Sequence, residues 1–226
     1  MNTSKVNEPA KASQFATASS QITVPAVAAS VILLVALHIL KPDYNPLSRF
    51  ISEYTIGEYG WLMQLAFILM GIASLSIAAA LWGRSNGFWV KLGLAMHVAV
   101  AVSMFGAASF TSDPASTPPA LMTLHGKVHI VFAMLGIPSG AVAGLVLAYA
   151  MTSRGTAGRR LLIWPAWALA LTALSMIIYM NVIAAQNRVV GPDDFAGVFN
   201  RFVVAASFWW WLAASRFANR QIIRKP

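Results

Sequence analysis

Apolar residues fall in six long runs along the chain, separated by short polar segments. The runs cover residues 22–40, 61–81, 90–110, 126–151, 161–185 and 198–214. Each run is continuous rather than alternating between apolar and polar residues, which excludes strands. A helix needs roughly 20 apolar residues to cross about 30 Å of hydrocarbon. The pattern therefore predicts an all-α, polytopic membrane protein, a compact bundle of six transmembrane helices.

The segments outside these runs predict the domain organisation. Residues 1–21 are rich in Ser, Ala and Thr and are expected to form a disordered cytoplasmic tail. Residues 22–215 form the six-helix transmembrane domain, and residues 216–226 form a basic cytoplasmic tail. The first apolar run is longer than the hydrophobic part of a signal peptide and no cleavage site follows it, so it is expected to remain as an anchor.

Composition and charge agree with this interpretation. The side chains are 58% hydrophobic and only 10% charged, with a mean hydropathy of +0.66. Eleven of the 16 Lys and Arg residues fall in the tails and in the loops after the second and fourth runs, whereas six of the seven acids fall in the other loops. The positive-inside rule then places both termini in the cytoplasm of a multi-pass protein of the inner (plasma) membrane. The net charge of +9 therefore reflects membrane topology, and no nucleic-acid partner is expected.

The polar stretch 38–61 is the first candidate for chemistry, because ionisable side chains gather there directly against an apolar run. His38 ends the preceding run, and Asp43, Ser52 and Glu53 follow among several tyrosines and two prolines. On the predicted topology this stretch faces the outside of the cell. It indicates where a site would lie without naming a substrate.

The loop before the fourth run is the second candidate. Asp113 lies in it, Thr123 is a plausible N-cap, and His125 and His129 are four residues apart, so both project from one helical face. This is the spacing at which two imidazoles share a divalent metal such as zinc, or one proton pathway. The alternative is a pair of interfacial histidines that hydrogen-bond to loop backbone.

Other residues inside the predicted helices favour packing roles. Gly136, Gly140 and Gly144 recur every four residues, a ridge that predicts close helix contact centred on Gly140. His97 lies toward the opposite side of the membrane from the other histidines, and one hydrogen bond to a neighbouring helix would satisfy it. Arg201 either extends its charge to the interface or holds a carboxylate or phosphate.

The chain resembles the bacterial membrane family known as domain of unknown function 998, over residues 24–216. The resemblance rests on His38, on PLSRFISEYTIGEYGWLM, on TSDP followed by TLHGKVH, and on Gly197 with Arg201. It implies a six-helix integral membrane protein with no established activity. It also supports the interpretation that the polar residues of these motifs form one site.

The predicted topology gathers all the candidate residues at the outer ends of the helices. The expected catalytic residues are His125, His129, Asp113, Glu53 and Ser52, and the expected substrate-binding residues are His38, Asp43 and Arg201. Such a site would act on a lipid or lipid-linked substrate by metal-assisted or acid–base chemistry, with His125 and His129 as the metal ligands. The alternative is a non-catalytic lipid-binding protein or an accessory subunit that docks a membrane protein partner. A transporter is less favoured, because acidic residues at mid-membrane are lacking.

Overall fold

The computed structural model describes residues 8–83, 86–153 and 155–223, and these form six α-helices, two short 3₁₀ helices and no strand. The α-helices are α1 (Glu8–Leu40), α2 (Gly60–Leu81), α3 (Phe88–Ser109), α4 (Leu124–Ala150), α5 (Ala157–Ala185) and α6 (Ala196–Ile223). The 3₁₀ helices η2 (Ile51–Thr55) and η3 (Pro119–Leu121) lie in loops. The prediction of an all-α fold is confirmed, and α1 to α5 are long and apolar enough to cross a membrane.

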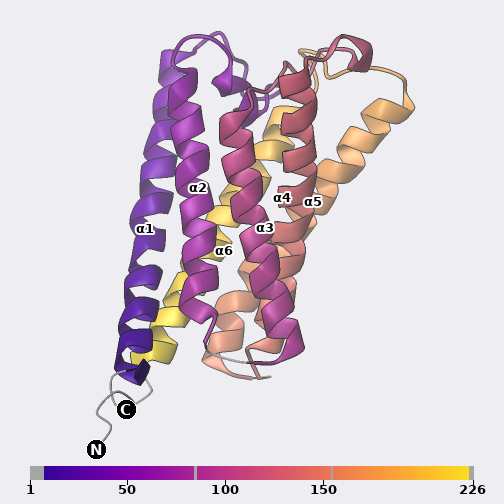
Figure 1. Ribbon diagram of the computed structural model, residues 1–226. Coiled ribbons are helices and arrows are strands. Elements are labelled where there is room, and N and C mark those ends of the chain that lie inside the picture. Colours follow the sequence, from indigo (N-terminus) through magenta and orange to yellow (C-terminus); the bar gives the residue numbers. More distant parts are fainter. Residues whose placement is uncertain (1–7, 84–85, 154, 224–226) are drawn as a thin grey trace, which may run out of the picture.

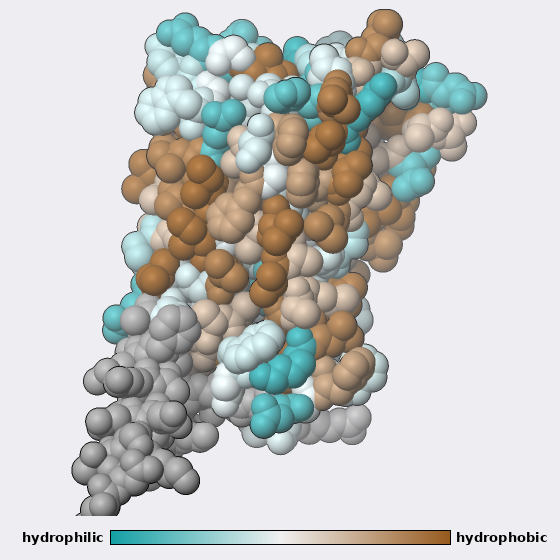
Figure 2. All heavy atoms as spheres, viewed as in Figure 1, coloured by the Kyte–Doolittle hydropathy of each residue, from teal (hydrophilic) through white to brown (hydrophobic). Residues whose placement is uncertain are grey.

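The helices pack as a bundle in which neighbours in sequence lie side by side, and α6 packs on α1 to close the ring (Figure 1). The loops after α1, α3 and α5 share one end of the bundle, and both ends of the described chain lie at the other. Hydrophobic side chains cover the middle of the visible face, and hydrophilic ones gather toward its ends (Figure 2). This is the surface that a bilayer requires.

Helix α6 differs from the other five because it is less apolar than a membrane span usually is. It contacts α1, α2, α4 and α5, so much of its surface faces protein. Polar residues at its start, Asn200 and Arg201, bond to other parts of the chain rather than to lipid. A helix enclosed in this way does not need to be apolar on every face.

Two helices extend beyond their predicted ends. Helix α1 begins at Glu8, so the expectation of disorder does not hold for residues 8–21, and residues 1–7 lie outside the described chain. Pro9 stands in the first turn, where its missing N–H costs nothing, and alanines follow it. Helix α6 continues to Ile223, through most of the predicted basic tail.

The glycine ridge of α4 makes close contacts at Gly136 rather than at Gly140. A Cβ on Gly136 would overlap the Ser103 hydroxyl of α3, whereas one on Gly140 would find only Val100 Cγ2, at an ordinary 3.6 Å. A Cβ on Gly144 would lie 3.6 Å from the Ala166 backbone of α5. The expectation of a backbone contact at Gly140 is therefore wrong, because that glycine borders a cavity.

His97 joins three helices in the buried core. Its Nδ1 lies 2.8 Å from Ser74 Oγ of α2, and Trp210 Nε1 of α6 donates to its Nε2 at 3.0 Å. The Ser74 hydroxyl donates to the His97 carbonyl, so Nδ1–H must donate to Ser74 and the ring is neutral. The expected hydrogen bond to a neighbouring helix is confirmed.

Candidate functional site

An elongated cavity of about 260 Å³ runs into the bundle from the end that carries the loops after α1, α3 and α5. Helix α4 lines it from Gly126 to Gly140 with residues three or four apart, that is, with one face. Fourteen residues of helix rise about 21 Å, so the cavity spans roughly two-thirds of a hydrocarbon core. Residues of α2, α3, α4, α5 and α6 all line it, so the cavity lies inside the bundle.

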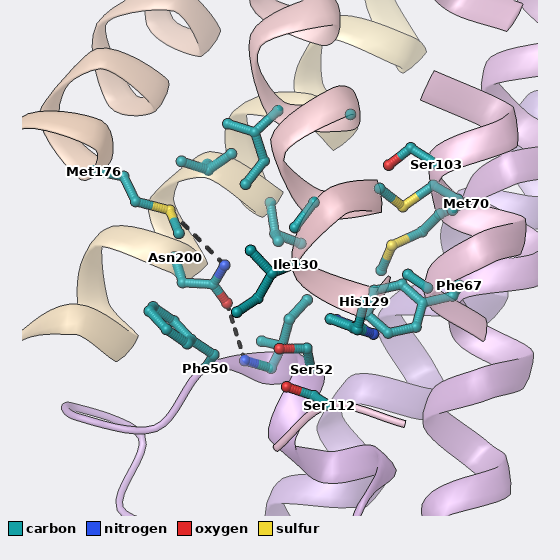
Figure 3. A pocket seen from close by; sticks show the side chains of 18 of the residues that line it. Phe50, Ser52, Phe67, Met70, Ser103, Ser112, His129, Ile130, Met176 and Asn200 are labelled. Atoms are coloured by element: carbon teal, nitrogen blue, oxygen red, sulfur yellow. Dashed lines mark hydrogen bonds between the residues drawn. The ribbon is translucent and has the colours of Figure 1, made fainter. Parts of the chain in front are cut away.

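The wall of the cavity is mostly apolar and rich in methionine. Five of the chain's ten methionines line it, from α2, α3, α5 and the segment before α4: Met70, Met104, Met122, Met176 and Met180. Methionine is unbranched and flexible, so such walls adapt to ligands of different shape. Figure 3 shows Met70 and Met176 entering the cavity from opposite sides.

Polar side chains gather in the outer part of the cavity, around η2 and the starts of α4 and α6. They are Ser52, Ser112, Asp113, Thr117, His129 and Asn200. The hydroxyls of Ser52 and Ser112 and the amide of Asn200 can be followed in Figure 3. The Ser112 N–H donates to Thr55 Oγ1 at 3.3 Å, and the Thr55 hydroxyl donates to the Ser52 carbonyl at 2.7 Å, which joins the two serine-bearing segments.

His129 is buried in this wall, 4% exposed, and packs against Phe67 with ring centroids 5.9 Å apart. Its Nδ1 lies 2.7 Å from the carbonyl of Phe110, the residue that caps α3. The Ala107 carbonyl is a second backbone acceptor for the ring. Carbonyls at a helix C-terminus lack partners within the helix, so Nδ1–H donates. In the neutral ring, Nε2 then carries a lone pair, and no described residue forms a hydrogen bond with it.

His38 has the same tautomer as His129, but both of its ring nitrogens have hydrogen-bond partners. Its Nδ1 donates to the Leu34 carbonyl at 2.6 Å, and its Nε2 accepts from Arg201 Nε at 3.1 Å. His97 is likewise bonded at both nitrogens. Among the three buried or half-buried histidines, His129 is therefore the one whose Nε2 has no hydrogen-bond partner among the described residues, and its side chain lines the cavity.

Arg201 forms a clasp beside the cavity with His38, Tyr54 and two carbonyls. Its Nη1 donates to the carbonyls of Arg49 at 2.7 Å and Gly197 at 3.1 Å, and its Nη2 lies 2.9 Å from His38 Nε2 and 3.3 Å from the Tyr54 hydroxyl. With Nε bonded to His38, all five guanidinium N–H groups have acceptors. Burial raises the pKa of Tyr54, so the ring stays neutral beside the cation.

Gly197 allows the clasp to close. A Cβ there would lie 2.5 Å from the carbonyls of Pro46 and Arg49, so only glycine lets this loop cross the first turn of α6 so closely. The Val198 N–H donates to the Leu47 carbonyl at 3.1 Å. Gly197 therefore allows the loop after α1 to approach α6 closely enough for Arg201 to reach its carbonyl.

The two carboxylates predicted to assist a histidine bond elsewhere. Glu53 is buried, accepts from Arg49 Nη1 at 2.7 Å and from the Phe50 N–H at 2.9 Å, and holds the start of η2. Asp113 accepts from the Thr123 N–H at 2.7 Å and the Thr123 hydroxyl at 2.9 Å, bracing the cap of α4. The predicted N-cap is confirmed, since the Thr123 hydroxyl accepts from the Gly126 N–H.

The predicted site residues therefore separate into groups. His38, Glu53 and Arg201 belong to the clasp and its loop, whereas Ser52, Asp113 and His129 line the cavity. Asp43 is exposed in the loop after α1 and belongs to neither the clasp nor the cavity wall. His125 is exposed on the first turn of α4, edge-on to the Phe110 ring at 5.4 Å.

The described residues contain no group of three His, Cys, Asp or Glu side chains placed to hold a metal ion. A shared ion would have only His125 and His129 as protein ligands, and His129 would bind it through Nε2. The zinc site remains a prediction from the spacing.

Sequence reasoning missed Asn200 and the methionine wall. Asn200 Oδ1 accepts from the Ile51 N–H at 2.9 Å, which turns its Nδ2 toward Met176 Sδ at 4.0 Å. Asn200 is a polar residue near the start of the apolar run 198–214, and such a residue could have been recognised from the sequence. Met176 and Met180, four apart on one face of α5, could have been recognised as well.

The model of a family described as "Protein of unknown function (DUF998)" matches residues 24–216. No curated protein and no solved structure matches significantly.

Proposed function

The chain belongs to the DUF998 family, and we propose that this member binds the hydrocarbon chain of a lipid in the cavity, with the lipid head at the polar outer end. The observation that carries the proposal is the form of the cavity, which is mostly apolar, extends over about 21 Å of α4 and has polar groups near the loops. A soluble metabolite would not match such a wall. A lipid tail is apolar and matches most of it.

The side of the cavity next to α4 and α5 supports entry from the bilayer. These two helices are less buried within the bundle than α2 and α3. Ile130, near the start of α4, lines the cavity and is 45% exposed. Helix α5 also leans away from α4 toward the outer end (Figure 1).

We further propose that the cavity opens on the outer leaflet of the inner membrane and that both termini are cytoplasmic. The acids Asp43, Glu58 and Asp193 lie in loops at the cavity end, and Arg159 and Arg220 lie at the opposite end. This distribution is the one that the positive-inside rule associates with a cytoplasmic basic side.

The test is a cavity-filling substitution with a matched control on the same helix. Ala133 lines the cavity, so Ala133→Phe should displace the lipid, whereas Val131 is 66% exposed on the outside and Val131→Phe should not. Native mass spectrometry of protein purified in mild detergent should show lipid adducts for wild type and Val131→Phe only. Equal lipid retention by both variants, with both folded, would refute the proposal.

Acid–base catalysis on the bound lipid is the second candidate, and the free Nε2 of His129 is the observation that favours it. Incubation with total lipid extract, followed by mass spectrometry, should then reveal a product that His129→Ala does not form. Zinc analysis of wild type and of His125→Ala tests the metal-assisted form of this candidate. An accessory role beside another membrane protein stays a prediction from the sequence.

A further inference from the structure

The polar residues of the cavity also indicate which class of lipid it takes. We infer that the ligand is an uncharged lipid whose head carries a hydroxyl group, rather than an anionic phospholipid. This inference rests on the proposed lipid-binding function and adds the chemistry of the head group. It follows from the charges that line the cavity and from the hydrogen-bonding groups that remain unused.

Charge is the first argument. No Lys or Arg side chain is among the described residues that line the cavity, and Asp113 is the single lining residue with a formal charge. A phosphate brought into an apolar cavity without a cation loses its hydration and gains no counter-charge, and a neighbouring carboxylate adds repulsion. The cavity is therefore electrostatically unsuited to a phosphate.

The basic residues near the cavity do not supply that missing charge. Arg201 has acceptors for all five N–H groups, and Arg49 pairs with Glu53 at 2.7 Å. Lys41 is buried and donates to the carbonyls of Tyr54 and Ile56, and burial lowers its pKa. Lys127 is exposed on α4 and does not line the cavity.

The unused hydrogen-bonding groups are the second argument. His129 Nε2 offers a lone pair and therefore needs a donor from the ligand. The Ser52 hydroxyl has no partner among the described residues, and the Asn200 amide has only a sulfur atom at 4.0 Å, so both can donate. Both Asp113 oxygens already accept from Thr123.

A hydroxyl is the head group that meets these requirements, because it donates to one partner and accepts from another while carrying no charge. An ester, an ether or a quinone carbonyl accepts hydrogen bonds but gives His129 no donor. A phosphate ester brings a charge that nothing in the wall neutralises. Long-chain alcohols and acylglycerols with a free hydroxyl are the lipids with this chemistry.

The experiment uses a photoreactive long-chain alcohol on the full-length protein in nanodiscs of uncharged phosphatidylcholine. Labelling is challenged with hexadecanol, hexadecyl methyl ether or hexadecyl phosphate at equal mole fraction. Hexadecanol should compete about tenfold better than the ether, the change expected from one hydrogen bond in a buried site. It should outcompete the phosphate by more than that.

Variants of His129 test whether this residue causes the preference for the alcohol over the ether. The ratio of alcohol to ether competition should fall to about one in His129→Leu and return in His129→Gln, which restores an acceptor. Val131→Leu, on the same helix but outside the cavity, should keep the wild-type ratio. Because each ratio is measured within one variant, a change in folded fraction does not alter it.

The outcomes separate the inference from the function that it rests on. If labelling of the cavity persists in Ala133→Phe, or no cavity residue is labelled, the lipid-binding function is wrong. If labelling is lost in Ala133→Phe but the phosphate or the ether competes as well as the alcohol, the head-group inference is wrong and lipid binding stands. The inference also fails if the preference survives in His129→Leu.

Discussion

Replacing Gly136 by alanine should destabilise the bundle, whereas the same change at Gly140, one turn along α4, should not. A Cβ on Gly136 would overlap the Ser103 hydroxyl and lie 2.8 Å from Ser103 Cβ. Either α3 and α4 move apart, at about 1–3 kcal/mol for overpacking, or Ser103 turns and loses its 2.7 Å bond to the Phe132 carbonyl, about 1 kcal/mol. A Cβ on Gly140 meets only Val100, at 3.6 Å.

Thermal unfolding in one detergent measures the difference between these variants. Each kcal/mol corresponds to roughly 2–4 °C in a chain of this size, so Gly136→Ala should unfold several degrees below Gly140→Ala. Adding Ser103→Gly, which removes both overlapping atoms, should recover much of the loss, as a double-mutant cycle would show. Equal Tm values for the two alanine variants, or no recovery in the double variant, would refute this account of the helix contact.

Three further predictions concern the clasp, the loop after α5 and the topology. Arg201→Met leaves the Arg49 carbonyl and its other acceptors unpaired, so it should lower the Tm more than Arg188→Met does in its exposed ion pair. The hydrogen bond from Arg188 lowers the pKa of Asp194 to about 2; this stabilisation is present above the unfolded value of 3.8 and lost as pH falls toward 2. Asp194→Asn should therefore flatten the pH dependence of unfolding between pH 4 and 2, and an unchanged slope would contradict the assignment. Reporter fusions after Arg159 should report the cytoplasm and fusions after Glu58 the exterior, and the inverse pattern would overturn the topology.

The sequence predicted the helices well because the bilayer imposes their ends. The runs 61–81, 90–110 and 126–151 correspond to α2 (Gly60–Leu81), α3 (Phe88–Ser109) and α4 (Leu124–Ala150) within two residues at each end. Each boundary is where apolar side chains give way to polar ones, which a sequence shows directly. Helix α1 departed from this pattern at its start, because helix formation outside the membrane does not require an apolar run.

The candidate site was harder to predict because backbone groups decide its hydrogen bonds. Asp113 pairs with the Thr123 N–H, and His129 pairs with the Phe110 carbonyl, rather than with each other. A sequence shows which side chains are polar but does not show which carbonyls remain free at a helix end. The cavity could not be predicted from the sequence. Small and flexible residues such as Gly140 and Met176 occur both in tightly packed helix contacts and in cavity walls, and the sequence does not distinguish the two.

The clasp also has a consequence for the order of assembly during synthesis. Arg201 bonds to His38 across 163 positions of the chain, so the loop after α1 cannot complete its bonds until α6 has been inserted. Five helices are in the membrane by then, and local pairs such as α1 with α2 can already pack. A nascent chain that stops before α6 leaves Tyr54 and the Arg49 carbonyl without their cation. A chain that lacks α6 therefore carries a loop after α1 whose hydrogen bonds are incomplete.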